Sequence, residues 1–292
     1  MFDWDDLRIF LGAARAGSLT AASLQLGVDA ATVGRRIARL EGALKATLFT
    51  RSAQGLQLTS AGARLLEAAR HAESAMAEAL EAGSQDTVGG TVRISAAEGF
   101  GAWVIAPALP RLQAQRPGLR IELAAQAGFL SPSRREVDIA VTLSAPVQAR
   151  LVVEPLTDYD LGLYAARSFL QAAPAPKKPS DLHGLPLVGY VDDLIFAPEL
   201  RYLDEIHPGL RPMLSSSSIQ AQKAMVAAGA GIGVLPCFLA QDLERVLPQV
   251  RLRRRFWIST HRDVASTARA RTVRAWLGDL VARRRADLMP DG

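Results

Sequence analysis

The chain has few of the features that would tie it to an oxidising compartment or a membrane. Cys237 is the only cysteine among 292 residues, so no disulfide forms within the chain and a reducing compartment is expected. No apolar run approaches the roughly 18 residues of a transmembrane helix. The first residues, MFDWDDLRIF, are acidic where a signal peptide is basic. We therefore expect a cytoplasmic protein with no membrane partner.

Sequence signatures of catalysis and of metal binding are also missing. No G-x-S-x-G stretch is present. The glycine-rich stretch GAGIGV at 229–234 follows an expected helix and precedes an expected strand, the reverse of a nucleotide-binding loop. The histidines lack Cys or Glu neighbours at the spacing of metal ligands: His71, His183, His207 and His261. We expect no catalytic residues, no metal site and no cofactor.

The composition is that of a folded protein. Hydrophobic residues make up 49% of the chain and charged residues 22%, which excludes disorder over most of its length. A chain of 292 residues predicts two or three domains. The net charge of +5 permits a nucleic-acid partner but does not require one, so the placement of the charges has to decide.

The first forty-five residues show three short helical patterns separated by glycines. The first ends at Gly17, and Thr20 is placed to cap a second helix over 21–26. Gly27 then supplies a turn, and Asp29 is placed to cap a third helix. The apolar stripe of that third helix has helical spacing: Val33, Ile37, Leu40 and Leu44.

A basic face lies opposite this stripe. Two short helices around a glycine turn, the second with such a face, are typical of a helix-turn-helix that places its second helix in a DNA groove. An arginine row on an isolated helix is more often a solvated face, but the small residues Ala30, Ala31 and Gly34 would let this backbone approach DNA closely. The segment TLFTRSAQGLQLT predicts a β-hairpin wing. The candidate DNA-binding residues are Ala31, Thr32, Arg35, Arg36, Arg39, Thr50, Arg51 and Ser52.

A long helix is expected from Thr59 onward, with apolar residues at the spacing of a coiled-coil seam. The polar, glycine-rich stretch GSQDTVGG at 83–90 then predicts a linker. The stripe either packs on its own domain or joins two protomers, and we favour dimerisation. The candidate dimerisation residues are Leu65, Leu66, Ala69, Ala72, Met76, Ala79 and Leu80.

These motifs resemble those of the LysR-type transcriptional regulators. The stretch SLTAASLQLGVDAATVGRRIARLEGALKATLFTRS is similar to their winged helix-turn-helix and its ending LE..L...LF.R. Where family members often have Ser-Gln-Pro-Ala-Val-Ser, this chain has Asp-Ala-Ala-Thr-Val-Gly at 29–34. Ala30 and Gly34 therefore replace residues of the usual recognition pattern. The resemblance implies DNA binding but not a copied target sequence.

From Thr91 onward, short apolar strands alternate with helices. TVRISA, LRIELAA and VDIAVTL are strand candidates, and a crossover helix over 103–115 predicts parallel pairing of the first two. LGLYAA, LPLVGY, RPMLSSS and GIGVLP form a second set. Two α/β lobes follow, with the crossing near 156–160, and the amphipathic segment 267–288 closes the chain.

In the LysR-type family this layout resembles a periplasmic binding protein that holds a small effector between its lobes. Strand ends are also where open α/β sheets bind ligands. Each polar residue at these strand ends could equally cap a helix or form a turn. The prediction of an effector site therefore depends on their common position. The candidate effector-binding residues are Ser95, Glu98, Gly99, Phe100, Gln126, Thr142, Ser144, Tyr190, Ser216 and Ser217.

Glu98 leads to a separate expectation about the effector. Helix N-termini attract anions, and the family often binds carboxylates there. A glutamate at the entrance would repel an acidic effector or occupy its place. We expect a neutral or cationic effector, or one recognised away from Glu98.

The resulting hypothesis is a LysR-type regulator that binds double-stranded promoter DNA as a homodimer or homotetramer, responds to a small-molecule effector, and contacts RNA polymerase. Its expected fold is multi-domain: an all-α winged helix-turn-helix at 1–60, a linker and dimerisation helix at 61–90, and an α/β periplasmic-binding-protein-like domain of two lobes at 91–292. Lobe 1 is expected at about 91–160 and 267–292, and lobe 2 at about 161–266. Two alternatives stay open: a cytosolic small-molecule binding protein whose N-terminal module contacts proteins, and an α/β enzyme with an unrecognised site.

Overall fold

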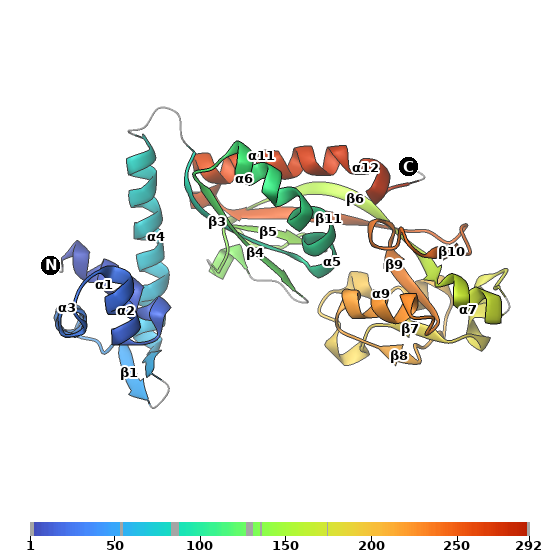
Figure 1. The fold of residues 1–292 in the computed structure, drawn as a ribbon, viewed down its shortest axis with the longest axis horizontal. Helices are drawn as coiled ribbons and strands as arrows, with labels where there is room; N and C mark the ends of the chain where they lie inside the picture. The colour runs from blue at the N-terminus through green and yellow to red at the C-terminus, as the bar shows by residue number, and fades with distance from the viewer. Residues whose placement is uncertain are drawn as a thin grey trace. The chain divides into compact units, whose positions relative to one another are not determined.

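The computed structural model describes residues 3–52, 55–82, 88–126, 131–134, 136–173 and 175–290. The chain divides into two compact units, Met1–Asp86 and Thr87–Gly292 (Figure 1). The second unit is formed around one large sheet, and the first around three packed helices. The long helix belongs to the first unit.

The N-terminal unit has the predicted helix-turn-helix and wing. β1 and β2 pair as an antiparallel hairpin, which α4 follows. The elements are α1 (Trp4–Ala16), α2 (Leu19–Leu26), α3 (Ala30–Leu44), β1 (Phe49–Ser52), β2 (Gly55–Leu58) and α4 (Ser60–Ala82).

Each of the first three helices begins at a capping side chain. Asp3 accepts a hydrogen bond from the backbone N–H of Asp5, and Asp29 accepts one from that of Thr32. Ser18, not Thr20, caps α2 by accepting from the N–H of Ala21. Thr20 was the wrong choice, because α2 starts one residue before it. Caps of this kind satisfy N–H groups that have no partner within the helix.

The apolar stripe of α3 packs into the core of this unit. Val33, Ile37 and Leu40 are buried among residues of α1 and β1. The fourth predicted member of the stripe, Leu44, is 37% exposed, because α3 ends there and Lys45 turns the chain with a positive φ. The buried face therefore ends before the last turn of the helix.

The turn between α3 and β1 is held by Glu41. Its Oε1 accepts hydrogen bonds from the N–H groups of Leu48 at 2.6 Å and of Phe49 at 3.3 Å. Gly62 lies against the same turn, where a Cβ would stand 2.1 Å from the carbonyl oxygen of Leu48. The glutamate in the quoted sequence motif is thus a structural residue.

The second unit contains nine described strands in one mixed sheet. Their order is β4-β3-β5-β11-β6-β9-β7-β8, and β10 pairs with β6. The strands are β3 (Gly90–Ala97), β4 (Leu119–Gln126), β5 (Ile139–Thr142), β6 (Leu151–Ala165), β7 (Leu187–Gly189), β8 (Leu214–Ser215), β9 (Ile232–Pro236), β10 (Glu244–Val246) and β11 (Leu252–His261). The α-helices are α5 (Glu98–Phe100), α6 (Leu109–Gln115), α7 (Arg167–Ala172), α8 (Leu203–Ile206), α9 (Ile219–Ala227), α10 (Arg262–Ala265), α11 (Ala268–Arg283) and α12 (Arg285–Leu288).

Two long strands, β6 and β11, run through both lobes (Figure 1). β11 pairs with β5 of lobe 1 at one end, while β6 pairs with β9 of lobe 2 at the other. The sequence analysis placed 161–266 wholly in lobe 2, but β11 returns the chain to the sheet of lobe 1 at Trp257. Two cross-strand ion pairs join these strands, Arg253 with Asp160 and Arg255 with Asp158.

Most other predicted elements are confirmed. The three strand candidates of lobe 1 are β3, β4 and β5, and β3 pairs with β4 in parallel. The predicted crossover helix starts earlier, at Glu98, and includes a π-helical segment, Gly101–Ile105. Gly229 follows α9 with a φ of +84°, and β9 follows it, so GAGIGV has the predicted order of helix and strand.

Replacing Glu41 by alanine should destabilise the turn before the wing. Two N–H groups next to the core lose their acceptor, which should lower the local free energy of unfolding by about 1–3 kcal/mol. Hydrogen exchange of the Leu48 and Phe49 amides measures this. Glu67→Ala on the exposed face of α4 is the matched control. Equal exchange in both variants would contradict the assignment.

Candidate functional site

The N-terminal half of α3 presents an ordered polar chain to solvent. Asp29 accepts from the N–H of Thr32 at 2.7 Å and from its hydroxyl at 2.6 Å. The hydroxyl of Thr32 in turn accepts from Arg35 at 2.9 Å. These hydrogen bonds from Thr32 hold the pKa of Asp29 below its usual value. Ala31 and Arg35 are exposed beside this chain, so this end of the helix is accessible to a partner.

The other two arginines of the predicted basic face meet carboxylates of α1. Arg39 donates from Nε and Nη2 to the two oxygens of Asp6, both at 2.6 Å, and Asp6 is fully buried. Arg36 forms an ion pair with Asp5 at 2.6 Å. These arginines thus link α3 to α1, a role that the sequence analysis did not foresee.

Of the predicted DNA-binding residues on the wing, Thr50 has a described side chain. Thr50 is exposed, and its hydroxyl donates to the carbonyl of Gln57 at 3.3 Å. The side chains of Arg51 and Ser52 lie outside the described part, although their backbones pair with Leu56 and Gly55 in the hairpin. The wing itself is therefore in place.

The stripe predicted for dimerisation faces the core of its own unit at its N-terminal end. Ala69 is fully buried there, and Leu65, Leu66 and Ala72 are partly buried against the same cluster. Met76, farther along α4, is 46% exposed. The side chains of Ala79 and Leu80 lie outside the described residues. Among the described residues of the stripe, Met76 is thus more accessible to a second protomer than the residues in the first turns of α4.

A cavity of about 50 Å³ lies between the lobes of the second unit. A buried water needs roughly 10–15 Å³ by the same measure, so a few waters would fill it. Its walls are apolar and aromatic, and Glu98 is the only charged residue among them. The lining residues are Ala97, Glu98, Gly99, Phe100, Leu143, Tyr159, Leu161, Tyr190, Phe196, Leu200, Tyr202, Ser217, Ile219, Pro236, Phe238 and Phe256.

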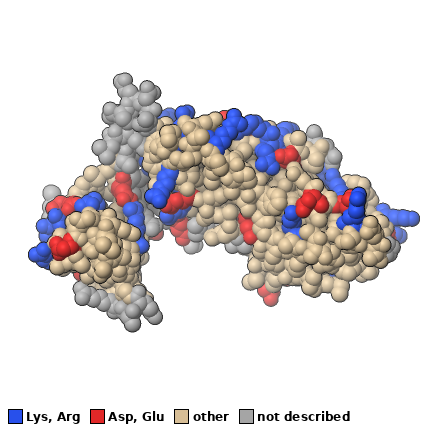
Figure 2. All heavy atoms as spheres, viewed as in Figure 1, with Lys and Arg blue, Asp and Glu red and all other residues tan. Residues whose placement is uncertain are grey.

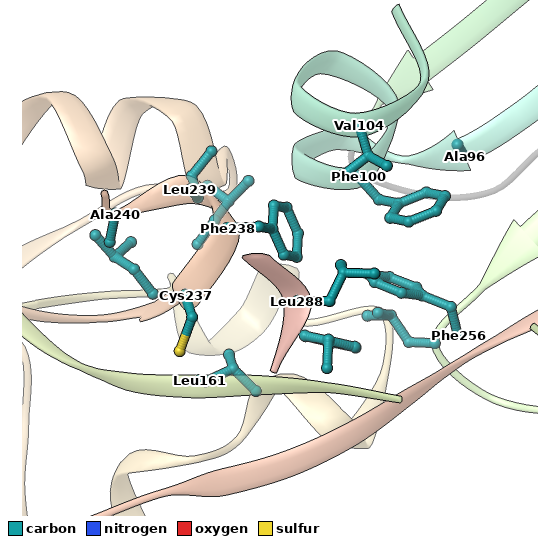
Figure 3. Close-up of a cluster of buried hydrophobic side chains, with 14 of the residues drawn as sticks. Ala96, Phe100, Val104, Leu161, Cys237, Phe238, Leu239, Ala240, Phe256 and Leu288 are labelled. Carbon is teal, nitrogen blue, oxygen red and sulfur yellow. The ribbon is translucent and has the colours of Figure 1, made fainter. Parts of the chain in front are cut away.

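Aromatic rings from both lobes form the floor of this cavity. Tyr159 and Phe256 stack with centroids 4.1 Å apart, and Phe100 lies 4.4 Å from Phe256. Phe238 approaches Phe100 from lobe 2 at 6.4 Å (Figure 3). Burial raises the pKa values of Tyr159 and Tyr190 well above their usual range, so their hydroxyls stay protonated.

Glu98 crosses the cleft and caps a helix of the opposite lobe. Its Oε2 accepts from the N–H of Ile219, the first residue of α9, at 3.0 Å. Its Oε1 accepts from the hydroxyl of Ser218 at 2.8 Å. N–H groups at a helix N-terminus favour negative charge, and Glu98 supplies that charge to α9.

Two further polar contacts join the lobes. Ser144 donates to Oε1 of Glu199 at 2.5 Å. Oε2 of Glu199 is buried and accepts no hydrogen bond from the described residues. Trp103 donates to Gln220 at 2.8 Å, and Lys223 lies over its ring at 4.6 Å. Together with Glu98, these side chains join the two lobes across the cleft.

The structure brings about half of the predicted effector residues to the cavity. Glu98, Gly99, Phe100, Tyr190 and Ser217 line it. Ser144 bridges the lobes through Glu199 instead. Four others take no part in its wall: Ser95, Gln126, Thr142 and Ser216.

The sequence analysis missed the aromatic wall of this cavity. Its members come from separate segments of the chain: Tyr159, Phe196, Tyr202, Phe238 and Phe256. Phe256 lies on β11, directly after three consecutive arginines. The aromatic and β-branched residues of FWIST at 256–260 were the available signal for this strand.

Neither a metal centre nor a membrane span is found in the part of the chain that the structure describes. There, no three His, Cys, Asp or Glu side chains are grouped as metal ligands would be. No described helix is both long and apolar enough to cross a bilayer.

Comparison with known families decides between the open alternatives. Residues 4–63 match the model of the bacterial regulatory helix-turn-helix protein, lysR family, and residues 85–282 match the LysR substrate binding domain. The chain belongs to the LysR family. It is a LysR-type DNA-binding transcriptional regulator with an effector-binding domain.

Relatives of this LysR-type regulator match it along nearly its whole length. The Mau operon transcriptional activator of Paracoccus denitrificans is 28% identical over 285 residues, covering 96% of this chain and 97% of the relative. A full-length OxyR variant from Pseudomonas aeruginosa has the same fold, with a TM-score of 0.69, 19% identity, and coverage of 96% of this chain and 95% of that one. Full-length LysG from Corynebacterium glutamicum, solved with bound effector Arg, gives a TM-score of 0.62, 22% identity, and coverage of 97% and 99%.

Membership in the LysR family confirms the leading hypothesis at the level of function. Members are transcriptional regulators rather than enzymes, which removes the α/β-enzyme alternative. LysR-type regulators bind promoter DNA and effectors and form oligomers. A cytoplasmic location and a contact with RNA polymerase stay predictions.

Removing the Glu98 carboxylate should expose the first N–H group of α9 to solvent in this LysR-type regulator. In Glu98→Ala the Ile219 amide loses its acceptor, and its hydrogen exchange should rise by about fivefold or more, as expected for one lost hydrogen bond. Glu154→Ala, a surface glutamate paired with Arg274, is the control. Unchanged exchange at Ile219 in Glu98→Ala would show that Glu98 does not hold α9.

Proposed function

We propose that this regulator reads promoter DNA with the N-terminal half of α3 and responds to a neutral or cationic effector in its cleft. We infer the effector class from the hydrogen bonds that Glu98 accepts from Ser218 and Ile219 at the N-terminus of α9. RNA polymerase is a further proposed partner, contacted when the oligomer rearranges on DNA. For such a switch, the effector has to bind one arrangement better than the other.

The DNA proposal is supported by what α3 leaves exposed. Ala31 and Arg35 face solvent at the end of the helix that follows the turn, and Thr32 orients Arg35. A recognition helix contacts base edges with its N-terminal residues. The small residues Ala30, Ala31 and Gly34 let the backbone come close to a groove; a Cβ on Gly34 would meet only Leu19, at 3.8 Å.

The effector proposal is supported by charge. An acidic ligand at α9 would have to displace Glu98 or lie beside it, and two carboxylates in one site repel each other. A neutral or cationic ligand meets no such cost, and Glu98 is the one charged side chain among the described residues that line the cavity. The aromatic walls favour an apolar body. The effector bound in LysG is Arg, so a relative of this fold takes a ligand with a cationic group.

DNA capture followed by sequencing tests the regulator as a whole. The full chain should enrich a dyad-related motif at moderate salt, and a metabolite pool that contains the effector should change the enrichment. If no motif is enriched, the proposed reading of promoter DNA by α3 is wrong.

Arg35→Ala tests the reading of bases. If Arg35 makes a bidentate base contact, specific binding should weaken by about 1–3 kcal/mol and the preference at one base pair should relax. Binding curves on the captured motif and on single-base variants measure both. Arg64→Ala on α4 is the matched control. A loss that is equal on every DNA sequence would assign Arg35 to phosphate.

A series of ligands with similar shape and different charge tests the effector class. Phenylacetate, phenylacetamide and phenethylamine differ mainly in charge, and calorimetry on the full chain should show weaker binding of the acid. Simple dicarboxylates should bind weakly, and Glu98→Gln should strengthen their binding. Tight binding of dicarboxylates by the unmodified protein, or no gain in Glu98→Gln, would contradict the proposal.

A further inference from the structure

The basic face of α3 carries less free charge than its sequence indicates. Arg36 and Arg39 lie among three carboxylates at the start of the chain, and Figure 2 shows acidic and basic groups side by side on this unit. Arg39 binds Asp6 and reaches Asp3 at 3.1 Å. Arg36 binds Asp5 at 2.6 Å, and it lies 3.4 Å from Asp6 and 3.8 Å from Asp3, so Asp5 is its nearest carboxylate. Arg35 alone among the three arginines forms no ion pair with a carboxylate of the described residues, and it donates to Thr32 instead.

The two ion pairs differ in how freely they can open. Asp6 is fully buried, so removing Arg39 would leave a buried carboxylate without its main partner, which is strongly unfavourable. Asp5 is different, because its side chain is 38% exposed and its Oδ1 accepts from Arg8 at 2.8 Å. If Arg36 leaves, Asp5 keeps both a cationic partner and solvent.

Asp5 stays charged under the conditions in which DNA binds. The hydrogen bond from Arg8 holds the pKa of Asp5 below its usual value. A fixed negative charge therefore lies beside Arg36 at neutral pH. Any phosphate that approaches Arg36 has to compete with this carboxylate.

We propose that Asp5 limits the DNA affinity of the protein by holding Arg36, whereas Asp6 positions α3 through Arg39. This inference rests on the proposed role of α3 in DNA binding. Arg36 then contacts phosphate only when it exchanges Asp5 for DNA, and Arg39 stays with Asp6 in both states. Base preference is left to Arg35 and its neighbours, so Asp5 affects all DNA sequences alike.

Asp5→Asn in the full chain is the direct test. Asparagine keeps the shape of the side chain but removes the charge, so Arg36 becomes available to phosphate. Anisotropy titrations on the captured motif and on a scrambled duplex, at several salt concentrations, give the affinity and its salt dependence. Binding should tighten on both duplexes by about two- to fivefold per half-site, the range for one exposed ion pair. The plot of log K against log salt should steepen by about 0.9 per added phosphate contact.

Two further variants separate this effect from others. In Asp5→Asn combined with Arg36→Gln, the gain should disappear, because no arginine is left to be released. Glu67→Gln removes one charge from the exposed face of α4 and measures the effect of net charge alone. Asp3, the cap of α1, is unchanged in all of them, and thermal unfolding verifies that each variant folds.

The outcomes are distinct. Weaker DNA binding in Asp5→Asn would mean that Asp5 orients Arg36 toward DNA, which overturns the inference. A gain that persists without Arg36, or that Glu67→Gln reproduces, would overturn it as well. Failure of the unmodified chain to bind any captured motif would instead count against the proposed function.

Discussion

The hydrogen bonds that the carboxylate of Glu98 accepts at the N-terminus of α9 are the constraint that links the two lobes at the cavity. The strands β6 and β11 run through both lobes, and ion pairs between them hold the two strands together. The strands connect the lobes, but the two lobes can still bend relative to each other. Contacts across the cleft then set how far the lobes approach, and Glu98 makes two of those hydrogen bonds.

The same physical device occurs in the DNA-binding unit. Asp5 pairs with Arg36 on α3, and Glu98 accepts hydrogen bonds at the N-terminus of α9. In both units an acidic side chain of the protein occupies a site of positive potential. On the two proposals made above, an anionic ligand binds in competition with this side chain, and the protein's own charges set the affinity.

Local signals in the sequence were enough to predict most of the elements. The spacing of Val33, Ile37 and Leu40 indicated the buried face of α3, and Asp29 marked its start. Thr20 was predicted as the cap of a helix over 21–26, whereas α2 begins at Leu19 and Ser18 caps it. Local rules of this kind decide the type of an element better than its first residue.

Contacts between distant segments could not be read from the sequence. A helical wheel places Arg39 on an outward face, but it does not show that α1 presents Asp6 to that face. The strand β11 was not predicted, because three consecutive arginines interrupt its apolar pattern, and Phe256 on the aromatic floor of the cavity was therefore missed as well. The position of Glu98 at a helix start was predictable, yet its partner Ser218 lies 120 residues away from it along the chain.

A distance measured between the lobes tests the central claim most directly. Spin labels at Gln113→Cys in lobe 1 and Asp193→Cys in lobe 2, both exposed sites, can be placed in a Cys237→Ser background of the full chain and read by pulsed electron resonance. With Glu98 present, the distribution should be narrow; in Glu98→Ala it should broaden or shift. Glu154→Ala should leave it unchanged. Identical distributions with and without the Glu98 carboxylate would contradict the account.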